Sequence, residues 1–358
     1  MKILSSRERI DAVLNHREVD RIPIQDHPWR TTVERWHREG LPESQTPDEY
    51  FGFEMKEFGF DASFQLPQEK MEETDEYTLV RNSDGALVKT WKHAITTPGW
   101  VDFLIKDRSD WEEYKSRMTM NSSRVDWEKE FVRCNKAREQ GFWVRLVAAI
   151  GYDRVQTIVG SEQLLIAMME NPDWVKDMFS TVAELVIHAA EEMMAGGFQF
   201  DGVIFCEDMG YRNALLFSPA LYRELAMPSD KRLCDFFKGK GLKVMLHSCG
   251  DVMELVPYLI EAGFDCLEPL EVKAGMDLVK MKKAYGDRLC FMGGIDVRKM
   301  ADPNPEVIEE EIRSKITVAK QGGGYIFHSD HSVPDDVSFE QYRRCMELVE
   351  CYGKYSVA

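Results

Sequence analysis

Residues 243–250 read Lys-Val-Met-Leu-His-Ser-Cys-Gly, a short apolar run with a polar end. An apolar run of this length between turn residues predicts a strand buried in a parallel sheet, here over 242–248. In a parallel α/β barrel the functional groups lie at the carboxyl ends of the strands. We therefore expect His247 and Cys249 to lie at the mouth of such a barrel.

The chain around this segment alternates apolar runs with amphipathic stretches from about residue 142 onward. This alternation predicts an α/β protein, a single (β/α)8 TIM barrel with 1–358 as one domain. An open doubly wound sheet gives the same pattern, but no GxGxxG or Walker-type loop supports nucleotide binding. The predicted strands are 142–150, 201–205, 242–248, 264–267, 288–292 and 324–328. The predicted helices are 161–195, 219–239, 252–262, 276–284, 305–321 and 338–351.

The first 140 residues are less regular and predict N-terminal helical and hairpin elaborations of the barrel. The segment 21–24, Arg-Ile-Pro-Ile, is the candidate for the first barrel strand. The stretch 77–100 predicts a β-hairpin, because its Asn-Ser-Asp-Gly at 82–85 is typical of a tight turn.

Charge and cysteine content exclude several classes of function. The 358 residues carry 45 Lys and Arg against 62 Asp and Glu, a net charge of −17 that repels nucleic acid and anionic membranes. No apolar stretch approaches the roughly 20 residues of a membrane span, and charges in the first nine residues favour a cytoplasmic protein over an exported one. The eight cysteines lack the spacing of a disulfide framework and are expected to be reduced. Five of them, in apolar patterns, are predicted core thiols: Cys206, Cys234, Cys266, Cys290 and Cys345.

The other predicted strand ends are also polar and supply further candidates. Glu207, Asp208, Glu268 and Asp330 are the candidate catalytic acids. Four residues near the predicted mouth are candidates for cofactor contacts: His27, Arg30, Tyr211 and Asp296.

His247 and Cys249 are two residues apart, so on an extended strand end their side chains share one face. An imidazole and a thiolate provide half of a tetrahedral zinc site, and a catalytic zinc needs three protein ligands. His331 or Asp330, from the loop after the last strand, is the natural third ligand.

Seven short segments, in this order, give the chain a family resemblance that covers nearly its whole length. The sequence resembles the uroporphyrinogen decarboxylase superfamily, which implies one (β/α)8 barrel with a deep cleft at the strand ends. The segments are 21–24, 60–62, 216–219, 243–250, 268–271, 293–296 and 331–334.

Within this superfamily, the decarboxylases use an Arg-Gln-Ala-Gly-Arg signature to hold substrate carboxylates and an aspartate to bind the pyrrole NH groups. Here the first region retains at most Arg30, and Gln68 stands where the aspartate is expected. An amide lacks the negative charge that gathers four NH donors. Near the predicted mouth only Arg30, Arg212 and Lys273 are cationic, too few for a polyanionic substrate.

The other branch contains cobalamin-dependent methyltransferases, which bind zinc through His-x-Cys and a distant cysteine. His247 and Cys249 match the first two ligands, and His331 stands at the third. The resemblance therefore implies a zinc-dependent methyltransferase that works with a corrinoid protein and a small-molecule methyl donor or thiol acceptor. It also implies a homodimer. The alternative is a carboxy-lyase acting on a tetrapyrrole or a smaller acid; a catalytically silent barrel explains the ionisable strand ends least well.

Overall fold

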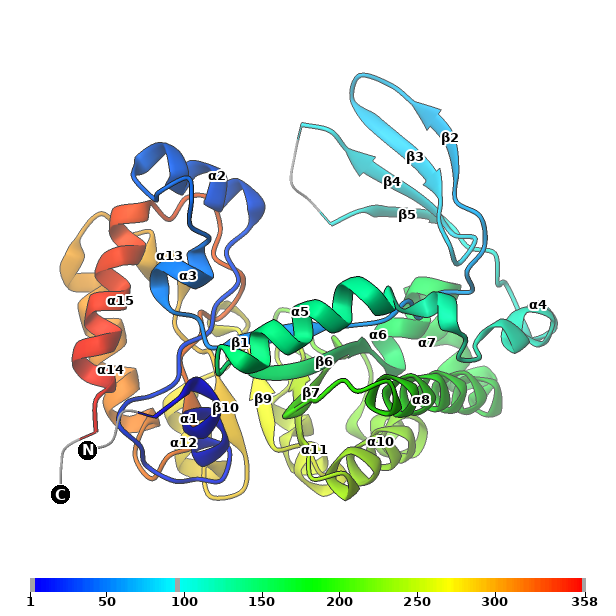
Figure 1. Ribbon diagram of the computed structural model, residues 1–358. Coiled ribbons are helices and arrows are strands. Elements are labelled where there is room, and N and C mark those ends of the chain that lie inside the picture. Colours follow the sequence, from blue (N-terminus) through cyan, green and yellow to red (C-terminus); the bar gives the residue numbers. More distant parts are fainter. Residues whose placement is uncertain (1–3, 94–96, 356–358) are drawn as a thin grey trace.

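The computed structural model describes residues 4–93 and 97–355, and its centre is a curled parallel sheet (Figure 1). Seven strands are hydrogen-bonded in the order β1-β6-β7-β8-β9-β10-β11, with every neighbouring pair parallel. The strands are β1 (Met55–Phe58), β6 (Trp143–Ala149), β7 (Gly202–Cys206), β8 (Lys243–His247), β9 (Cys266–Glu268), β10 (Cys290–Met292) and β11 (Tyr325–Ile326).

Helices follow each strand from β6 onward, which confirms the predicted α/β alternation. The helices before β6 are α1 (Ser6–Val13), α2 (Arg30–Glu39), α3 (Pro47–Phe51), α4 (Arg108–Tyr114) and α5 (Trp127–Glu139). Those after it are α6 (Gly151–Val159), α7 (Ser161–Glu170), α8 (Pro172–Ala195), α9 (Pro219–Leu221), α10 (Met227–Gly239), α11 (Val256–Ala262), α12 (Leu278–Tyr285), α13 (Val297–Met300), α14 (Pro305–Ala319) and α15 (Phe339–Gly353). Among the described residues, none of these helices combines the length and apolar character needed to cross a membrane.

The sheet is buried on both faces, as continuous apolar strands require. Val203, Ile204 and Phe205 of β7 are all buried, and so are Val144 and Leu146 of β6. The helices begin where the sequence provides caps. Ser338 and Gln341 form a capping box at the start of α15.

Two predicted helices are interrupted, in both cases at a proline. The helix expected over 161–195 is divided into α7 and α8, because Pro172 has no N–H to continue α7 and restricts Asn171 to a non-helical backbone. The helix expected over 219–239 contains a π-helical turn at Tyr222–Ala226. Pro228 follows this turn and cannot donate a backbone hydrogen bond to Glu224, so the helix widens there.

The predicted first strand is wrong in its extent. Within 21–24, Ile24 makes a single parallel bridge to Phe327, and Arg21 an antiparallel bridge to Lys354. Met55–Phe58 forms the first strand of the sheet instead. Its sequence, Met-Lys-Glu-Phe, has no apolar run. The strand accommodates the charge of Glu57 because Glu57 forms an ion pair with Arg145 of β6.

A second, antiparallel sheet projects from the helices that surround the first one (Figure 1). It has the order β2-β3-β4-β5, with β2 (Glu69–Glu73), β3 (Tyr77–Arg81), β4 (Leu87–Trp91) and β5 (Gly99–Asp102). The predicted hairpin is confirmed by the pairing of β3 with β4, although 94–96 lie outside the described residues. Its turn is tied to α6 by a buried ion pair of 2.7 Å between Arg154 Nη2 and Asp84 Oδ1.

Candidate functional site

Three neighbouring strands end side by side on polar residues. The backbone register pairs Cys206 of β7 with His247 of β8, and His247 with Glu268 of β9. Residues in register on parallel strands project to the same face, so the three side chains line one cavity of about 410 Å³. Its lining consists of His27, Glu57, Arg145, Val147, Ile204, Cys206, Asp208, His247, Cys249, Glu268, Pro269, His328, His331 and Ser332.

His247, Cys249 and Asp208 form a compact group of metal-ligand type. His247 Nε2 lies 3.5 Å from Cys249 Sγ and 3.7 Å from Asp208 Oδ1. The Cys249 backbone N–H donates to Asp208 Oδ1 at 2.8 Å, which fixes the carboxylate beside the thiol. One ligand atom from each residue lies within 4.8 Å of the others.

A close contact between two loops brings Asp208 to Cys249. A Cβ atom on Gly210 would lie 2.6 Å from the Cys249 carbonyl oxygen, and one on Gly250 would lie 2.3 Å from the Gly210 carbonyl carbon. Gly250 also has a φ of +83°, which favours glycine. The loops after β7 and β8 therefore touch only because both positions are glycine.

Glu268 orients the histidine of this group from the other side. Its Oε1 lies 3.1 Å from His247 Nδ1. Burial opposes its ionisation, but His247, His328 and Arg145 outweigh burial and lower the pKa of Glu268 to about 2. The carboxylate therefore accepts the Nδ1 proton, so Nε2 is directed to Cys249 and Asp208.

The donor atoms fit zinc. Zinc prefers histidine nitrogen, cysteine sulfur and carboxylate oxygen, and ideal tetrahedral bonds place a ligating nitrogen and sulfur about 3.6 Å apart. The observed separation is 3.5 Å. Burial raises the pKa of the Cys249 thiol despite the opposing effect of His247, and a bound cation would favour the thiolate that zinc needs.

The opposite wall of the cavity is held by Arg145 and Glu57. Arg145 is almost fully buried, and its Nε donates to Glu57 Oε1 at 3.0 Å. Its Nη1 lies 3.8 Å from Glu268 Oε2. Arg145 is the one Arg or Lys in the described lining, and two carboxylates already surround it. The cavity therefore offers no free cation to a polycarboxylate.

Four candidates outside the predicted His247–Cys249 pair do line this cavity: His27, Asp208, Glu268 and His331. His331 does not form a close group with His247 and Cys249 among the described residues, and Asp208 occupies that place instead. The reason is the glycine contact after β7 and β8, which brings Asp208 nearer than the loop after β11 brings His331.

Five other candidates point elsewhere. Glu207 is fully buried and accepts the Tyr152 N–H at 2.9 Å, because it follows Cys206 and projects to the opposite face. Asp330 accepts the N–H groups of Val272 and Val297 and so joins two loops. The remaining three lie outside the lining: Asp296 caps α13, Arg30 pairs with Glu34 on the exposed face of α2, and Tyr211 is exposed.

Four ionisable residues of the lining were missed by the sequence prediction: Glu57, Arg145, Cys206 and His328. Cys206 was expected in the core, but it is half-buried and faces the cavity. Arg145 carried a usable signal, since a charge inside the apolar run of β6 requires a buried partner. His328 stands at the end of a predicted strand. It could have been found because functional groups lie at the carboxyl ends of barrel strands.

The curled parallel sheet and the ionisable cavity at its strand ends define an α/β enzyme. The model of the uroporphyrinogen decarboxylase (URO-D) family matches residues 152–352, more than half of the chain. The chain therefore belongs to the URO-D family.

Two proteins from Methanosarcina mazei are similar to the chain, and the first places the resemblance on the methyltransferase branch, as predicted. A methylated-thiol–coenzyme M methyltransferase is 28% identical over 118 residues, and this match covers 32% of the chain and 29% of that relative. A solved structure described as a methyltransferase is 14% identical, with a TM-score of 0.65 over 98% of this chain and 99% of that one. At this identity the second match shows the fold alone.

Proposed function

We propose that the protein is a zinc-dependent methyltransferase that moves a methyl group between a small-molecule thiol or methyl donor and a corrinoid carried by a partner protein. The observation that carries this proposal is the grouping of Asp208, His247 and Cys249 at the end of β8. The methylated-thiol–coenzyme M methyltransferase relative supports the reaction class. The paired state of Arg145 argues against the alternative, a carboxy-lyase for a polycarboxylate.

In this proposal His247, Cys249 and Asp208 hold the zinc, and Glu268 keeps the His247 ring in position. Zinc, when bound, supplies the Lewis acidity that favours a thiolate over a thiol at neutral pH. Arg145 and Glu268 of the lining are buried, which strengthens the charge interactions around them.

His331 lines the same cavity and is suited to accept the proton that a substrate thiol loses. Burial and the nearby Lys273 lower its pKa, so the ring is neutral near pH 7 and has a lone pair that can accept a proton. This role replaces the ligand role expected from the sequence.

We further propose that the seven strands and the segment 21–25 close into one eight-membered barrel, and that the chain is one domain. The Phe327 N–H donates to the Pro23 carbonyl at 2.9 Å, and the Gln25 N–H to the Phe327 carbonyl at 3.0 Å. On the other side, the Glu54 N–H donates to the Ile24 carbonyl at 3.0 Å. The segment 21–25 thus supplies the link between β11 and β1.

The experiment is a thiol-dependent demethylation of methylcobalamin, followed by visible absorption, with zinc measured on the same samples. We expect zinc in the purified protein, and loss of both zinc and activity in Cys249→Ala. The matched control is Cys351→Ala, because Cys351 is exposed and remote from the cavity. Full activity in a Cys249→Ala protein that holds no zinc would overturn the proposal.

A further inference from the structure

A second group of metal-ligand side chains lies in the same cavity. It consists of His27 from the segment before α2, His328 from the segment after β11, and Glu268 at the end of β9. One ligand atom from each lies within 4.8 Å of the others. His27 Nδ1 and His328 Nε2 are only 2.9 Å apart.

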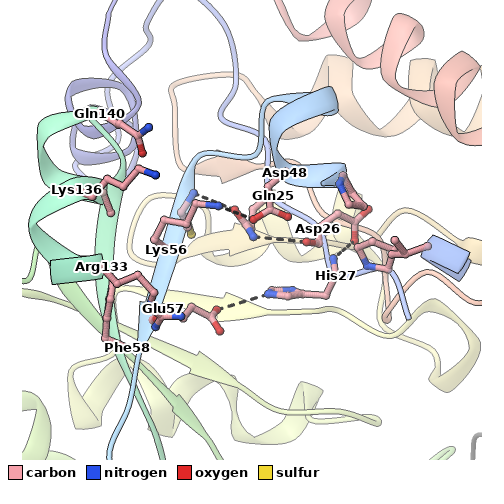
Figure 2. A pocket seen from close by; sticks show the side chains of 15 residues that line it. Gln25, Asp26, His27, Asp48, Lys56, Glu57, Phe58, Arg133, Lys136 and Gln140 are labelled. Carbon is pink, nitrogen blue, oxygen red and sulfur yellow. Dashed lines mark hydrogen bonds and ion pairs between the residues drawn. The ribbon is translucent and has the colours of Figure 1, made fainter. Parts of the chain in front are cut away.

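The partners of the two rings determine which nitrogens carry hydrogen. His328 Nδ1 lies 2.7 Å from the Ser329 carbonyl oxygen, which can only accept, so this nitrogen holds the proton. His27 Nε2 lies 3.5 Å from Glu57 Oε1, and Figure 2 shows the two side chains facing one another. With Nε2 as the donor there, both nitrogens of the 2.9 Å pair present lone pairs. Two facing lone pairs need a proton or a metal ion between them.

Glu268 contributes an oxygen without a hydrogen-bond partner. Its side chain is 3% exposed, and Oε2 makes no hydrogen bond in the described part of the chain. A buried carboxylate oxygen left in this state is costly. The nearest cation, Arg145, is 3.8 Å away and is directed mainly to Glu57.

The charges around the group favour a divalent cation. Arg145 is surrounded by the carboxylates of Glu57 and Glu268. Glu57 outweighs burial and raises the pKa of His27, so His27 must release a proton when a metal binds. In that metal-binding form, both rings are neutral and add no charge. The group therefore carries a net charge of about −1, and burial makes that charge more attractive to a cation than it would be in water.

His27 is also accessible from outside the cavity. His27 and Glu57 line both this cavity and a neighbouring one of about 510 Å³, between β1, α3 and α5 (Figure 2). The His27 side chain is 41% exposed. An ion thus has an approach to the group that does not pass His247.

We propose that His27, His328 and Glu268 form a second site for a divalent first-row transition metal ion. Two imidazole nitrogens and one carboxylate suit such ions, unlike the oxygen ligands that calcium and magnesium prefer. Glu268 belongs to both sites, with one oxygen on His247 and the other free for the second ion. This site does not depend on the proposed methyl transfer.

The test is a titration of metal-free protein with Co²⁺, followed by visible and near-ultraviolet absorption. The Cys249 site is expected to give a sulfur-to-cobalt charge-transfer band, and the second site only ligand-field bands. Wild-type protein should bind two equivalents. His27→Ala should bind one equivalent with the charge-transfer band, and Cys249→Ala one equivalent without it.

His188→Ala is the control variant, because His188 is an exposed residue of α8. If His27→Ala fails to fold, His328→Gln replaces it in the same titration. Thermal unfolding checks that this second variant is folded. A wild-type titration that ends at one equivalent with the charge-transfer band would overturn the second site and leave the zinc site intact. Binding of two equivalents of Co²⁺ by both His27→Ala and His328→Gln would also overturn it. One equivalent without that band, abolished in His27→Ala, would support this site and refute the zinc proposal.

Discussion

Glu268 Oε1 lies 3.1 Å from His247 Nδ1, across two strands whose register places the residues side by side. A carboxylate behind a ligating histidine fixes the ring and increases its basicity. We therefore expect Glu268→Gln to weaken zinc binding by roughly 10- to 100-fold. Competition with a coloured chelator measures this affinity. An unchanged affinity in folded variant protein would show that His247 needs no such support.

Asp208 and His331 are predicted to have separate roles. Asp208→Ala should release zinc, because Asp208 Oδ1 lies 3.7 Å from His247 Nε2 and next to Cys249. His331→Ala should keep its zinc but lose thiol-dependent demethylation near neutral pH, with partial recovery at higher pH as the thiol ionises in solution. Metal content and a pH profile of each variant check this. Zinc loss in His331→Ala alone would return the third-ligand role to that residue.

The strand β8, which carries His247, was predictable from local sequence, but the strand β1 of the same sheet was not. The apolar run of β8 ends at His247, and the alternation of side chains places Cys249 nearby. β1 escaped prediction because Lys56 and Glu57 interrupt its pattern, and Glu57 is explained only by Arg145 on another strand. A charged residue in a short strand reflects a tertiary pairing that local propensity does not contain.

Asp208 illustrates the same limit at the site. Its position after a predicted strand marked it as functional, yet its place beside Cys249 depends on Gly210 meeting Gly250 across two loops. His331 follows the last strand in the same way and looked equivalent in sequence. Only the path of the loops distinguishes the two.

Gly210→Ala is expected to separate these loops. The new Cβ would lie 2.6 Å from the Cys249 carbonyl oxygen, so the backbone must shift. We expect a loss of about 1–3 kcal/mol in the free energy of unfolding, together with weaker zinc binding. Gly239→Ala is the control, since a Cβ there meets no atom within 4 Å. Denaturant unfolding of both variants checks the prediction, and equal stabilities would contradict it.

Asp230 is predicted to make the stability of the protein depend on pH. Burial raises its pKa to about 7, whereas the unfolded chain has a value of roughly 3.9. Between these values the folded state binds the extra proton, so stability is fully present below about pH 4 and falls as the pH rises through about 7.

Asp230→Asn should therefore flatten this decline. Asparagine retains an oxygen that can accept the Tyr222 hydroxyl, which donates to Asp230 Oδ2 at 2.8 Å, and it cannot ionise. Urea unfolding from about pH 4 to about pH 8 should show the variant gaining stability relative to wild type as the pH rises. Asp235→Asn, an exposed position on the same helix, should track wild type. If the Asp230→Asn and wild-type curves run parallel, the proton is held elsewhere. The neighbouring buried carboxyl of Glu207 is the first place to look, since burial also raises its pKa.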